Sequence, residues 1–368
     1  MPTTLKDVAA LAGVSVATAS RALQGVDRIG EATREKVRAA AAELQYTPNR
    51  TARALSTGRT GTLGLIVPDL LNPFFPAVVK GAQARARELG MQLLLADTDE
   101  SPQAELPLVR TLAPQVDGVI LCSSRLDEQD LDTAAGLART VLVNREHGSL
   151  PSIVLDPGPG VAATLRHLRA LGHLRIGYAG GPATSSADAL RRTSLHETAR
   201  ELGLELRDLG SHTPDASGGA AAAEQVLLAR PDAVLAYNDV MALGMIDRLR
   251  GFGLAVPADL SVVGWDDIEF AGMARPALST IRVPRREAGC AAVDLLAALV
   301  RGDSVTSRRL GTELVLRAST ARAHGSARAP GRSPVDVARP PAPTLVDASR
   351  LGVDAPPDRT DPQEQHTP

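Results

Sequence analysis

From residue 63 onward, short apolar runs of strand length alternate with longer amphipathic stretches of helical periodicity. The runs that predict strands are 63–68, 92–96, 118–121, 140–143, 153–155, 176–178, 233–237 and 261–263, and the stretches that predict helices are 75–89, 103–112, 161–171 and 240–250. This alternation predicts an α/β fold with parallel sheets and helices on both faces. About 260 residues are long for one doubly wound sheet, so we expect two lobes. Ligands of such folds bind in the crevice beyond the carboxyl ends of the strands.

The first 47 residues follow another pattern, which predicts three short helices. Thr4 can cap the first helix, with Asp7 completing a capping-box-like pattern, and Gly13 ends it. Ser15 can cap a second helix over 16–23, and a third covers 31–45. Two helices joined by such a turn are typical of a helix-turn-helix, whose second helix enters a DNA major groove. A plain corner of a helical bundle is the alternative interpretation.

The balance of positive and negative residues also differs between the first 60 residues and the rest of the chain. Residues 1–60 hold nine Lys and Arg against five Asp and Glu, whereas the remaining 308 residues hold 31 against 37. A basic head on an acidic body favours a polyanion as partner of the head. The excess of four positive charges is also compatible with ordinary solvated helices.

Two segments lack the periodicity of a packed domain. Residues 49–60 predict a linker with a short helix from Asn49, which we expect to order only on a partner because isolated short helices are marginal in water. Residues 323–368 hold nine of the 26 prolines and show no apolar periodicity. They predict a disordered C-terminal tail.

Composition excludes several classes of protein. The two cysteines, Cys122 and Cys290, are too few for a disulfide framework or a cysteine-based zinc cluster, and buried thiols are the simpler interpretation. No run of 18 apolar residues predicts a membrane helix, and the N-terminal segment has no apolar signal region. We therefore expect a cytoplasmic protein without membrane contact, cofactor or metal, and a DNA-binding head would associate it with the nucleoid.

Several motifs together resemble the lactose-repressor (LacI/GalR) family of bacterial transcription regulators. They are LKDVAALAGVSVATASRAL at 5–23, YTPN at 46–49 followed by Ala52 and Leu55, PDLLNPFF at 68–75, HLRALGH at 167–173, NDVMALG at 238–244 and VGWDD at 263–267. The resemblance covers residues 3 to about 322. It implies a helix-turn-helix head (1–48), a hinge helix (49–60) and a core (61–322) like a periplasmic sugar-binding protein, with lobe crossings near 157, 283 and 311. It also implies a homodimer on double-stranded DNA with a pseudo-palindromic operator.

The resemblance assigns DNA-binding roles in the head and hinge. Thr18, Ser20 and Arg21 match positions that seat the second helix, and Arg21 also reaches a base edge or a phosphate. Val16 and Ala17 occupy the variable base-reading positions, where they can meet thymine methyl groups but cannot donate hydrogen bonds. The remaining residues implied at the DNA are Thr4, Ser15, Asn49, Arg50, Arg53 and Leu55.

Leu55 matches a hinge leucine that wedges into a minor-groove step and kinks the duplex. Its alternative role is a linker residue that packs on the core. Arg50, Arg53 and Arg59 are expected near phosphates, or else they are solvated linker charges.

The resemblance also implies an effector site between the lobes. Its residues are Phe74, Phe75, Asn144, Arg145, Arg191, Asn238, Asp239, Trp265 and Asp266. Planar donors and acceptors beside aromatic rings suit a sugar or another polyhydroxylated small molecule. Each of these residues has a structural alternative; Asn238 and Asp239 at a strand end can simply cap the next helix.

Three positions depart from the family pattern. Gly30 stands at a cap where Ser is usual, Pro157 follows Asp156 where Asn is usual, and Ser194 disturbs the register on which the assignment of Arg191 rests.

Two other functions compete with a transcription regulator, which we expect to be a repressor and not an enzyme. The glycines at 158 and 160 follow a predicted strand and imitate a dinucleotide fingerprint, but Pro157 and Pro159 remove two phosphate-binding amides. A transport binding protein would share the core but lack the DNA-binding head.

Overall fold

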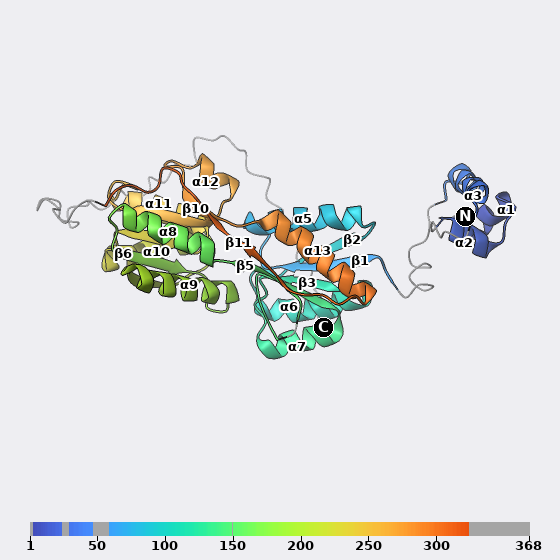
Figure 1. Ribbon diagram of the computed structural model, residues 1–368, viewed down its shortest axis with the longest axis horizontal. Helices are drawn as coiled ribbons and strands as arrows, with labels where there is room; N and C mark the ends of the chain where they lie inside the picture. Colours follow the sequence, from blue (N-terminus) through green and yellow to red (C-terminus); the bar gives the residue numbers. More distant parts are fainter. Residues whose placement is uncertain (1–2, 24–28, 47–58, 149, 324–368) are drawn as a thin grey trace, which may run out of the picture. The chain divides into compact units, whose positions relative to one another are not determined.

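A computed structural model describes residues 3–23, 29–46, 59–148 and 150–323 (Figure 1). Residues 49–58 of the predicted hinge and most of the predicted tail lie outside the described residues, as do Arg50, Arg53 and Leu55. Arg59 is described, and its Nη2 donates to the Val300 carbonyl oxygen at 3.1 Å. Within the described residues, a head of helices and a core of two sheets with flanking helices confirm the predicted α/β fold class.

The head consists of α1 (Leu5–Leu11), α2 (Val16–Leu23) and α3 (Glu31–Glu43). Its core is made of small side chains: Val8, Ala9, Ala19, Ala22, Val37 and Ala40. Both predicted helix starts are confirmed. The Asp7 carboxylate accepts hydrogen bonds from the backbone N–H and the hydroxyl of Thr4 at 2.8 and 2.7 Å, and Ser15 Oγ accepts one from the Thr18 N–H at 3.1 Å. Helix α3 ends two residues earlier than predicted.

The first lobe contains a six-stranded parallel sheet in the order β11-β5-β4-β3-β1-β2. The strands are β1 (Thr62–Val67), β2 (Gln92–Asp97), β3 (Val119–Cys122), β4 (Thr140–Val143), β5 (Ser152–Asp156) and β11 (Arg308–Gly311). The helices are α5 (Phe74–Glu88), α6 (Pro102–Leu112), η1 (Ala113–Gln115), α7 (Glu128–Leu137) and α13 (Arg285–Arg301). Leu65 and Val67 of β1 pack with α5 and α13, whereas Ile66 between them packs with α6 and α7. Both faces of the sheet are therefore covered.

The second lobe contains another six-stranded sheet, in the order β12-β10-β9-β8-β6-β7. The strands are β6 (Arg175–Gly180), β7 (Glu205–Ser211), β8 (Ala233–Ala236), β9 (Ser261–Asp266), β10 (Ser279–Arg282) and β12 (Glu313–Val315). The helices are α8 (Gly158–Ala170), α9 (Ser186–Leu202), α10 (Ala216–Ala229), α11 (Asp239–Gly251) and α12 (Glu269–Met273). All strand pairs are parallel except β10 with β12, which is antiparallel at the edge of the sheet. This edge pair was not anticipated.

Helices α9, α10 and α12 of the second lobe were not predicted, and the two longer ones have a physical reason. The buried stripe of α9 contains Asp188 and Arg191 beside its apolar residues, so no clean apolar periodicity is visible. Helix α10 contains Gly218 and Gly219, which are intrinsically unfavourable inside a helix. A Cβ on Gly219 would lie 2.0 Å from the Met241 carbonyl oxygen, so these glycines permit close packing of α10 on α11.

The chain passes between the two sheets three times. It leaves the first sheet after β5 and enters α8, returns after β10 into α13, and passes directly from β11 to β12 through Thr312. In the described ranges, no helix has both the length and the apolar character needed to cross a membrane.

Helices α5 and α13 cross at glycines. A Cβ on Gly289 would lie 2.1 Å from the Val78 carbonyl oxygen, and one on Gly81 would lie 2.0 Å from the Arg286 carbonyl oxygen. Because backbone atoms cannot rotate away as a side chain can, any larger residue must separate the helices.

We predict that Gly289→Ala lowers the free energy of unfolding by about 1–3 kcal/mol, the usual cost of overpacking a core. Gly136→Ala in α7 is the matched control, since nothing lies within 4 Å of its added Cβ. Urea denaturation of both variants measures the difference. Equal midpoints would contradict the close crossing of α5 and α13.

Candidate functional site

The second helix of the head has one buried and one exposed face. Ala19 and Ala22 are buried in the head core, whereas Val16, Ala17 and Arg21 are exposed. The Ser15 cap bonds also to the Thr18 hydroxyl at 2.8 Å, which holds the first turn of α2. The face of α2 that sequence reasoning assigned to DNA is therefore the face open to solvent.

Three other head residues have local contacts. Thr4 is bonded to Asp7, and these hydrogen bonds lower the pKa of the Asp7 carboxyl. Thr18 and Ser20 are only partly exposed. Their assignment to DNA stays a prediction.

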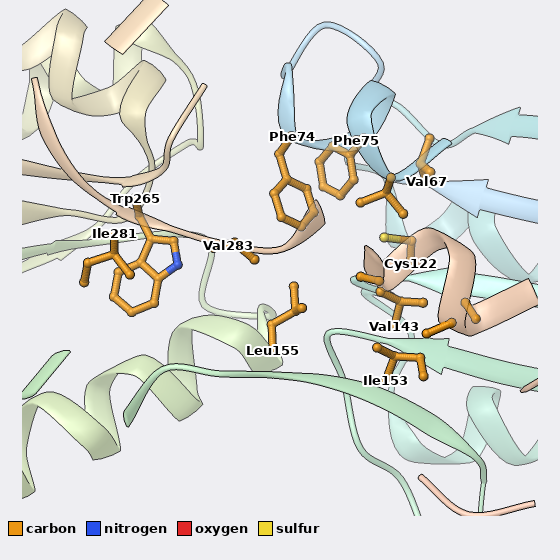
Figure 2. Packing of buried hydrophobic residues seen from close by; sticks show 14 of the residues in the cluster. Val67, Phe74, Phe75, Cys122, Val143, Ile153, Leu155, Trp265, Ile281 and Val283 are labelled. Carbon is orange, nitrogen blue, oxygen red and sulfur yellow. The ribbon is translucent and has the colours of Figure 1, made fainter. Parts of the chain in front are cut away.

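The predicted effector residues of the core lie where the two lobes meet. Phe74 and Phe75 begin α5, and their rings contact edge to face with centroids 4.9 Å apart. Figure 2 shows Val283 between these rings and Trp265, with Leu155 below them, and all five side chains belong to one buried cluster. The boundary between the lobes is thus apolar on this side.

Arg191 lies between two aromatic rings of the second lobe. Its guanidinium carbon is 4.2 Å from the Trp265 ring centroid and 4.6 Å from that of Tyr237. Its Nη1 donates to the Tyr237 carbonyl oxygen at 2.5 Å. The rings and this bond fix the guanidinium plane, which leaves Nη2 directed towards Asp266 at 3.9 Å.

Asp266 is buried with one carboxylate oxygen lacking a hydrogen-bond partner. The distance of 3.9 Å to Arg191 is too long for a hydrogen bond. Burial raises the pKa of Asp266 to about 7, although Arg191 and Arg285 oppose the shift. Its φ of +108° is rare for a residue with a side chain. A strained, buried and unsatisfied carboxyl is typical of a binding site.

Asn238 and Asp239 have structural bonds. Asn238 Oδ1 accepts from the Met241 N–H at 2.7 Å and so caps α11, while its Nδ2 donates to the Pro214 carbonyl oxygen at 2.7 Å. The Asp239 carboxylate accepts from the Thr280 hydroxyl at 2.6 Å and from a backbone N–H after β9 at 2.8 Å. Burial, reinforced by Asp266, raises the pKa of Asp239 well above its usual range.

Asn144 and Arg145 follow β4 in the first lobe. Asn144 has a left-handed φ of +61° and its Nδ2 donates to Ser123 Oγ at 3.0 Å. Arg145 Nη1 donates to the carbonyl oxygens of Ser124 and Leu126 at 3.0 and 2.5 Å, and its buried Nε has no partner. Both side chains therefore hold the end of β3 against the end of β4, and contact with a ligand stays a prediction.

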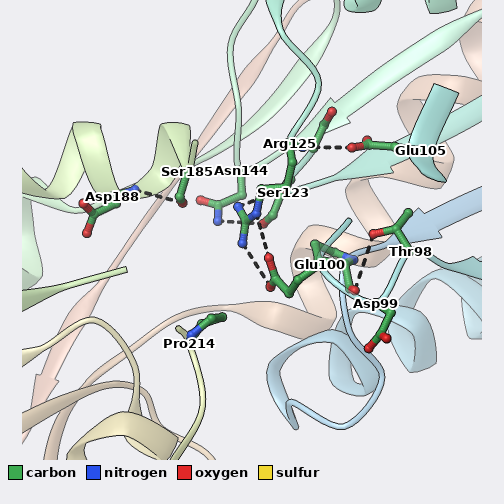
Figure 3. A network of polar contacts seen from close by, with 12 residues as sticks. Thr98, Asp99, Glu100, Glu105, Ser123, Arg125, Asn144, Ser185, Asp188 and Pro214 are labelled. Atoms are coloured by element: carbon green, nitrogen blue, oxygen red, sulfur yellow. Dashed lines mark hydrogen bonds and ion pairs between the residues drawn. The ribbon is translucent and has the colours of Figure 1, made fainter. Parts of the chain in front are cut away.

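Sequence reasoning missed a polar network in the first lobe, which Figure 3 shows opposite Ser185 and Asp188 of the second lobe. Arg125 binds both carboxylate oxygens of Glu100, at 2.9 and 3.1 Å. The Arg125 N–H donates to buried Glu105, whose pKa burial raises. The sequence feature that could have revealed this network is the polar segment Ser-Ser-Arg, which directly follows the apolar run of a buried strand.

A pocket of about 920 Å³ lies beside these residues, with walls from both lobes. Its lining includes Leu71, Lys80, Asp267, Phe270 and Arg285. None of the nine predicted effector residues is among its lining residues. Arg285 bridges the lobes there, donating to the carbonyl oxygens of Pro73 at 3.3 Å and Asp267 at 2.8 Å. Arg145 is partly exposed and the other eight predicted effector residues are buried, so the pocket is a separate feature.

The glycines that imitate a dinucleotide fingerprint have other partners. The Gly158 N–H donates to Asp156 Oδ1 at 3.0 Å, and the Gly160 N–H donates to the Thr312 hydroxyl at 3.2 Å. A Cβ on Gly160 would lie 2.5 Å from Thr312 Oγ1 and from Ile281 Cγ2. This glycine thus serves the packing of α8 on the sheet, and both amides are already bonded within the chain.

Titration of Asp266 has a consequence for stability. Its pKa is about 7 in the folded chain against an ordinary value of 3.8, so between these values the folded chain retains a proton that the unfolded chain releases. The free energy of unfolding therefore falls as pH rises from about 4 to about 7. We predict that Asp266→Asn, which cannot ionise, unfolds with a free energy higher by roughly 2–4 kcal/mol at pH 8. The difference shrinks towards pH 4, and urea denaturation across this range measures it. A difference independent of pH would contradict the raised pKa.

Comparison with known proteins finds a matching family model for the head and another for the core. The family model for bacterial regulatory proteins of the lacI family matches residues 4–49, and the model for a periplasmic binding protein-like domain matches residues 165–320. The chain is 32% identical to the HTH-type transcriptional regulator DegA of Bacillus subtilis, over 87% of this chain and 98% of DegA. It is 33% identical to the HTH-type transcriptional repressor CytR of Escherichia coli, over 86% of this chain and 96% of CytR.

Solved structures that resemble this chain are also of transcriptional regulators. The lac repressor dimer bound to operator and the anti-inducer ONPF superposes with a TM-score of 0.76 at 32% identity, over 87% of this chain and 100% of that one. A complex of the transcriptional regulator CelR with cellobiose gives a TM-score of 0.64 at 32% identity, over 86% of this chain and 99% of that one. The chain therefore belongs to the LacI family of bacterial DNA-binding transcriptional regulators, and the relatives that match it over nearly their whole length are regulators rather than enzymes.

Proposed function

We propose that the protein is a sequence-specific transcriptional repressor whose affinity for its operator is changed by a small-molecule effector bound between the two lobes. The observation that carries the DNA-binding part is the exposed face of α2, where Val16, Ala17 and Arg21 stand on a helix capped by Ser15. A capped helix that presents a short row of side chains can enter a major groove with its first turns. The proposed place of action is the cytoplasm, at the operator DNA in the nucleoid.

The proposed division of the chain is a head over 1–48, a hinge over 49–60, a core over 61–322 and a tail over 323–368. In this proposal Asn49 caps the hinge helix at the DNA, Arg50 and Arg53 approach phosphates, and Leu55 enters a central minor-groove step. The hinge couples the core to the DNA because its helix is too short to be stable alone.

The proposed effector is a sugar or sugar derivative held by Arg191 and Asp266. A hydroxyl group can donate to the unpartnered Asp266 oxygen, and Trp265 offers an apolar ring face beside it. The CelR complex with cellobiose supports this class of ligand. The effector changes DNA affinity only through its different affinity for the two arrangements of the lobes.

The proposed working unit is a homodimer. Leu71 is 90% exposed, Met273 69% and Phe270 54%, and Leu71 and Phe270 line the pocket beside α5 and α12. Exposed apolar side chains gathered in this way mark an interaction surface. The lac repressor dimer, which resembles this chain over its full length, supports a second copy as the partner.

Selection of binding sites from random duplex DNA, with the full chain and no added ligand, tests the proposal. A dimer with two recognition helices selects a palindrome, and a hinge wedge favours a flexible pyrimidine–purine step at its centre. No enrichment, with or without a panel of sugars, would contradict sequence-specific binding.

Arg21 is expected to supply specificity. We predict that Arg21→Ala lowers affinity for the selected site roughly 10- to 100-fold and relaxes base preference at one position, because a bidentate arginine contact discriminates between bases by about 1–3 kcal/mol. Arg38→Ala, which removes an equal charge from the exposed face of α3, is the control. Fluorescence anisotropy with specific and scrambled duplexes measures both. Equal losses on the two duplexes for Arg21→Ala would reduce its role to a phosphate contact.

Asp266 is expected to be needed for the effector and not for DNA. We predict that Asp266→Ala abolishes the change of Trp265 fluorescence produced by the sugar that binds the natural chain. Operator affinity without the sugar stays within about twofold, because the ion-pair partner of Asp266, Arg191, belongs to the core and not to the DNA-binding head. Asp247→Ala, which removes an exposed carboxylate from α11, keeps the response. A retained response in Asp266→Ala would exclude Asp266 from the effector site.

A further inference from the structure

The starts of three neighbouring strands in the first lobe bring polar side chains together. Strands β4, β3 and β1 are adjacent and parallel, so the residues that precede them share one edge of the sheet. This edge is opposite to the one where the strands run into the candidate effector site. The polar residues here are Arg59 and Thr60 before β1, Asp117 before β3 and Arg139 before β4. Sequence reasoning assigned no function to Asp117 or Arg139.

A hollow of about 290 Å³ lies among these residues, and its lining includes Arg59, Asp117 and Arg139. The Asp117 carboxylate accepts hydrogen bonds from the Thr60 N–H at 2.6 Å, from the Thr60 hydroxyl at 3.0 Å and from the Gly61 N–H at 2.9 Å. The negative charge in the hollow therefore already has three donors, and it holds the chain where the chain enters the core.

Arg139 is placed for a partner from outside. Its backbone is fixed, because its carbonyl oxygen accepts from the Val119 N–H at 2.8 Å and a Cβ on Gly118 would lie 2.7 Å from the same oxygen. Its side chain is exposed and has no hydrogen bond or ion pair to the described part of the chain. With two arginines and one aspartate in its lining, the hollow suits an anion.

The length of the hinge limits how far this hollow can lie from the DNA. Leu55 and Arg59 are four positions apart, and an extended chain spans at most about 14 Å over that distance. In the proposed complex Leu55 stands in the minor groove, which is about 6 Å wide and is bordered by the phosphates of both strands. Arg59 and the hollow that it lines therefore lie beside the DNA backbone, whatever path the chain takes between the two residues.

We propose that this hollow receives a phosphate of the operator backbone and that Arg139 binds it. The inference rests on the proposed function, because it takes Leu55 as the residue in the minor groove. A guanidinium presents paired N–H donors that match the oxygens of a phosphate. Such a contact fixes the position of a protein on the duplex without reading its sequence. The core thus holds the operator directly, in addition to the head and the hinge.

The salt dependence of operator affinity tests this contact in the full chain. Each phosphate that a protein neutralises contributes about 0.9 to the slope of log affinity against log salt concentration. We predict that Arg139→Gln lowers this slope by about 1 for each copy on the DNA and lowers affinity at low salt roughly 3- to 10-fold, with unchanged base preference. Fluorescence anisotropy with the duplex enriched from random DNA measures both quantities.

Two further variants are controls. Arg139→Lys keeps the charge and should keep the slope. Arg166→Gln removes an equal charge from the exposed face of α8, in the second lobe, which the hinge does not enter, and it should also keep the slope. Circular dichroism checks the folding of each variant. A natural slope in Arg139→Gln, or an equal fall in Arg166→Gln, would overturn the proposal.

Single methylphosphonate substitutions in the enriched duplex locate the contact, because each removes the charge of one phosphate. We expect the natural chain to lose affinity at one phosphate in each half-site beside the central step. Arg139→Gln should show no further loss there, since both changes remove the same contact. No sensitive phosphate beside the central step, a result that needs no variant, would overturn the contact. Additive losses would overturn it as well.

Failure of the proposed function gives a different result. If no duplex is enriched, sequence-specific binding fails and this inference falls with it. If a palindrome is enriched and Arg21→Ala loses it, whereas Arg139→Gln keeps the natural slope, the proposed function stands and only the contact of the core with DNA fails.

Discussion

Parallel strands covered by helices on both faces leave few places where polar chemistry can occur. The backbone groups of β1, β3, β4, β8 and β9 are paired to neighbours on both sides, and their side chains are buried. The chain becomes free to carry polar side chains only where a strand ends, and in a parallel sheet these ends share one edge. Ser123, Asn144, Tyr237 and Asp266 lie at or directly beyond such ends. The arrangement of the candidate effector site follows from this constraint and not from any single motif.

Three buried aspartates of the second lobe differ in how many hydrogen bonds their carboxylates accept. Asp188 accepts from Tyr178, from the Gly181 N–H and from Arg192. Asp239 is bonded on both oxygens to the turn after β9 and to β10. Asp266 retains a buried oxygen without a hydrogen bond. Asp188 and Asp239 hold neighbouring segments of the second lobe in place. A buried acceptor without a hydrogen-bond donor is destabilising unless a ligand supplies that donor. Two of these carboxyls are thus satisfied within the chain, and Asp266 retains an acceptor for the effector that we propose.

Much of the fold was predictable because short-range rules suffice for it. The helix starts at Thr4 and Ser15 follow from capping residues, and the strands β1 to β6, β8 and β9 follow from apolar runs. The strands β7, β10, β11 and β12 were not predicted. Helix α9 was not predictable, because its buried stripe includes charged residues that only a partner elsewhere in the chain makes acceptable. The site divides in the same way. Motifs pointed to Arg191 and Asp266 as candidate effector residues, but nothing near Arg125 in the sequence reveals Glu100 as its partner.

The sequence by itself determined the helix-turn-helix, the alternation of strands and helices, and the residue types available at each strand end. These depend on neighbours within a few positions, where periodicity and capping act. Only the tertiary structure decided which of those polar groups are already satisfied and which are left over. Asn238 is bonded to Pro214 and Met241, Arg125 to Glu100 and Ser123, and Asp266 Oδ1 to nothing within hydrogen-bond distance in the described chain. Hydrogen bonding depends on distances between atoms remote in sequence, which only the packing of the lobes sets.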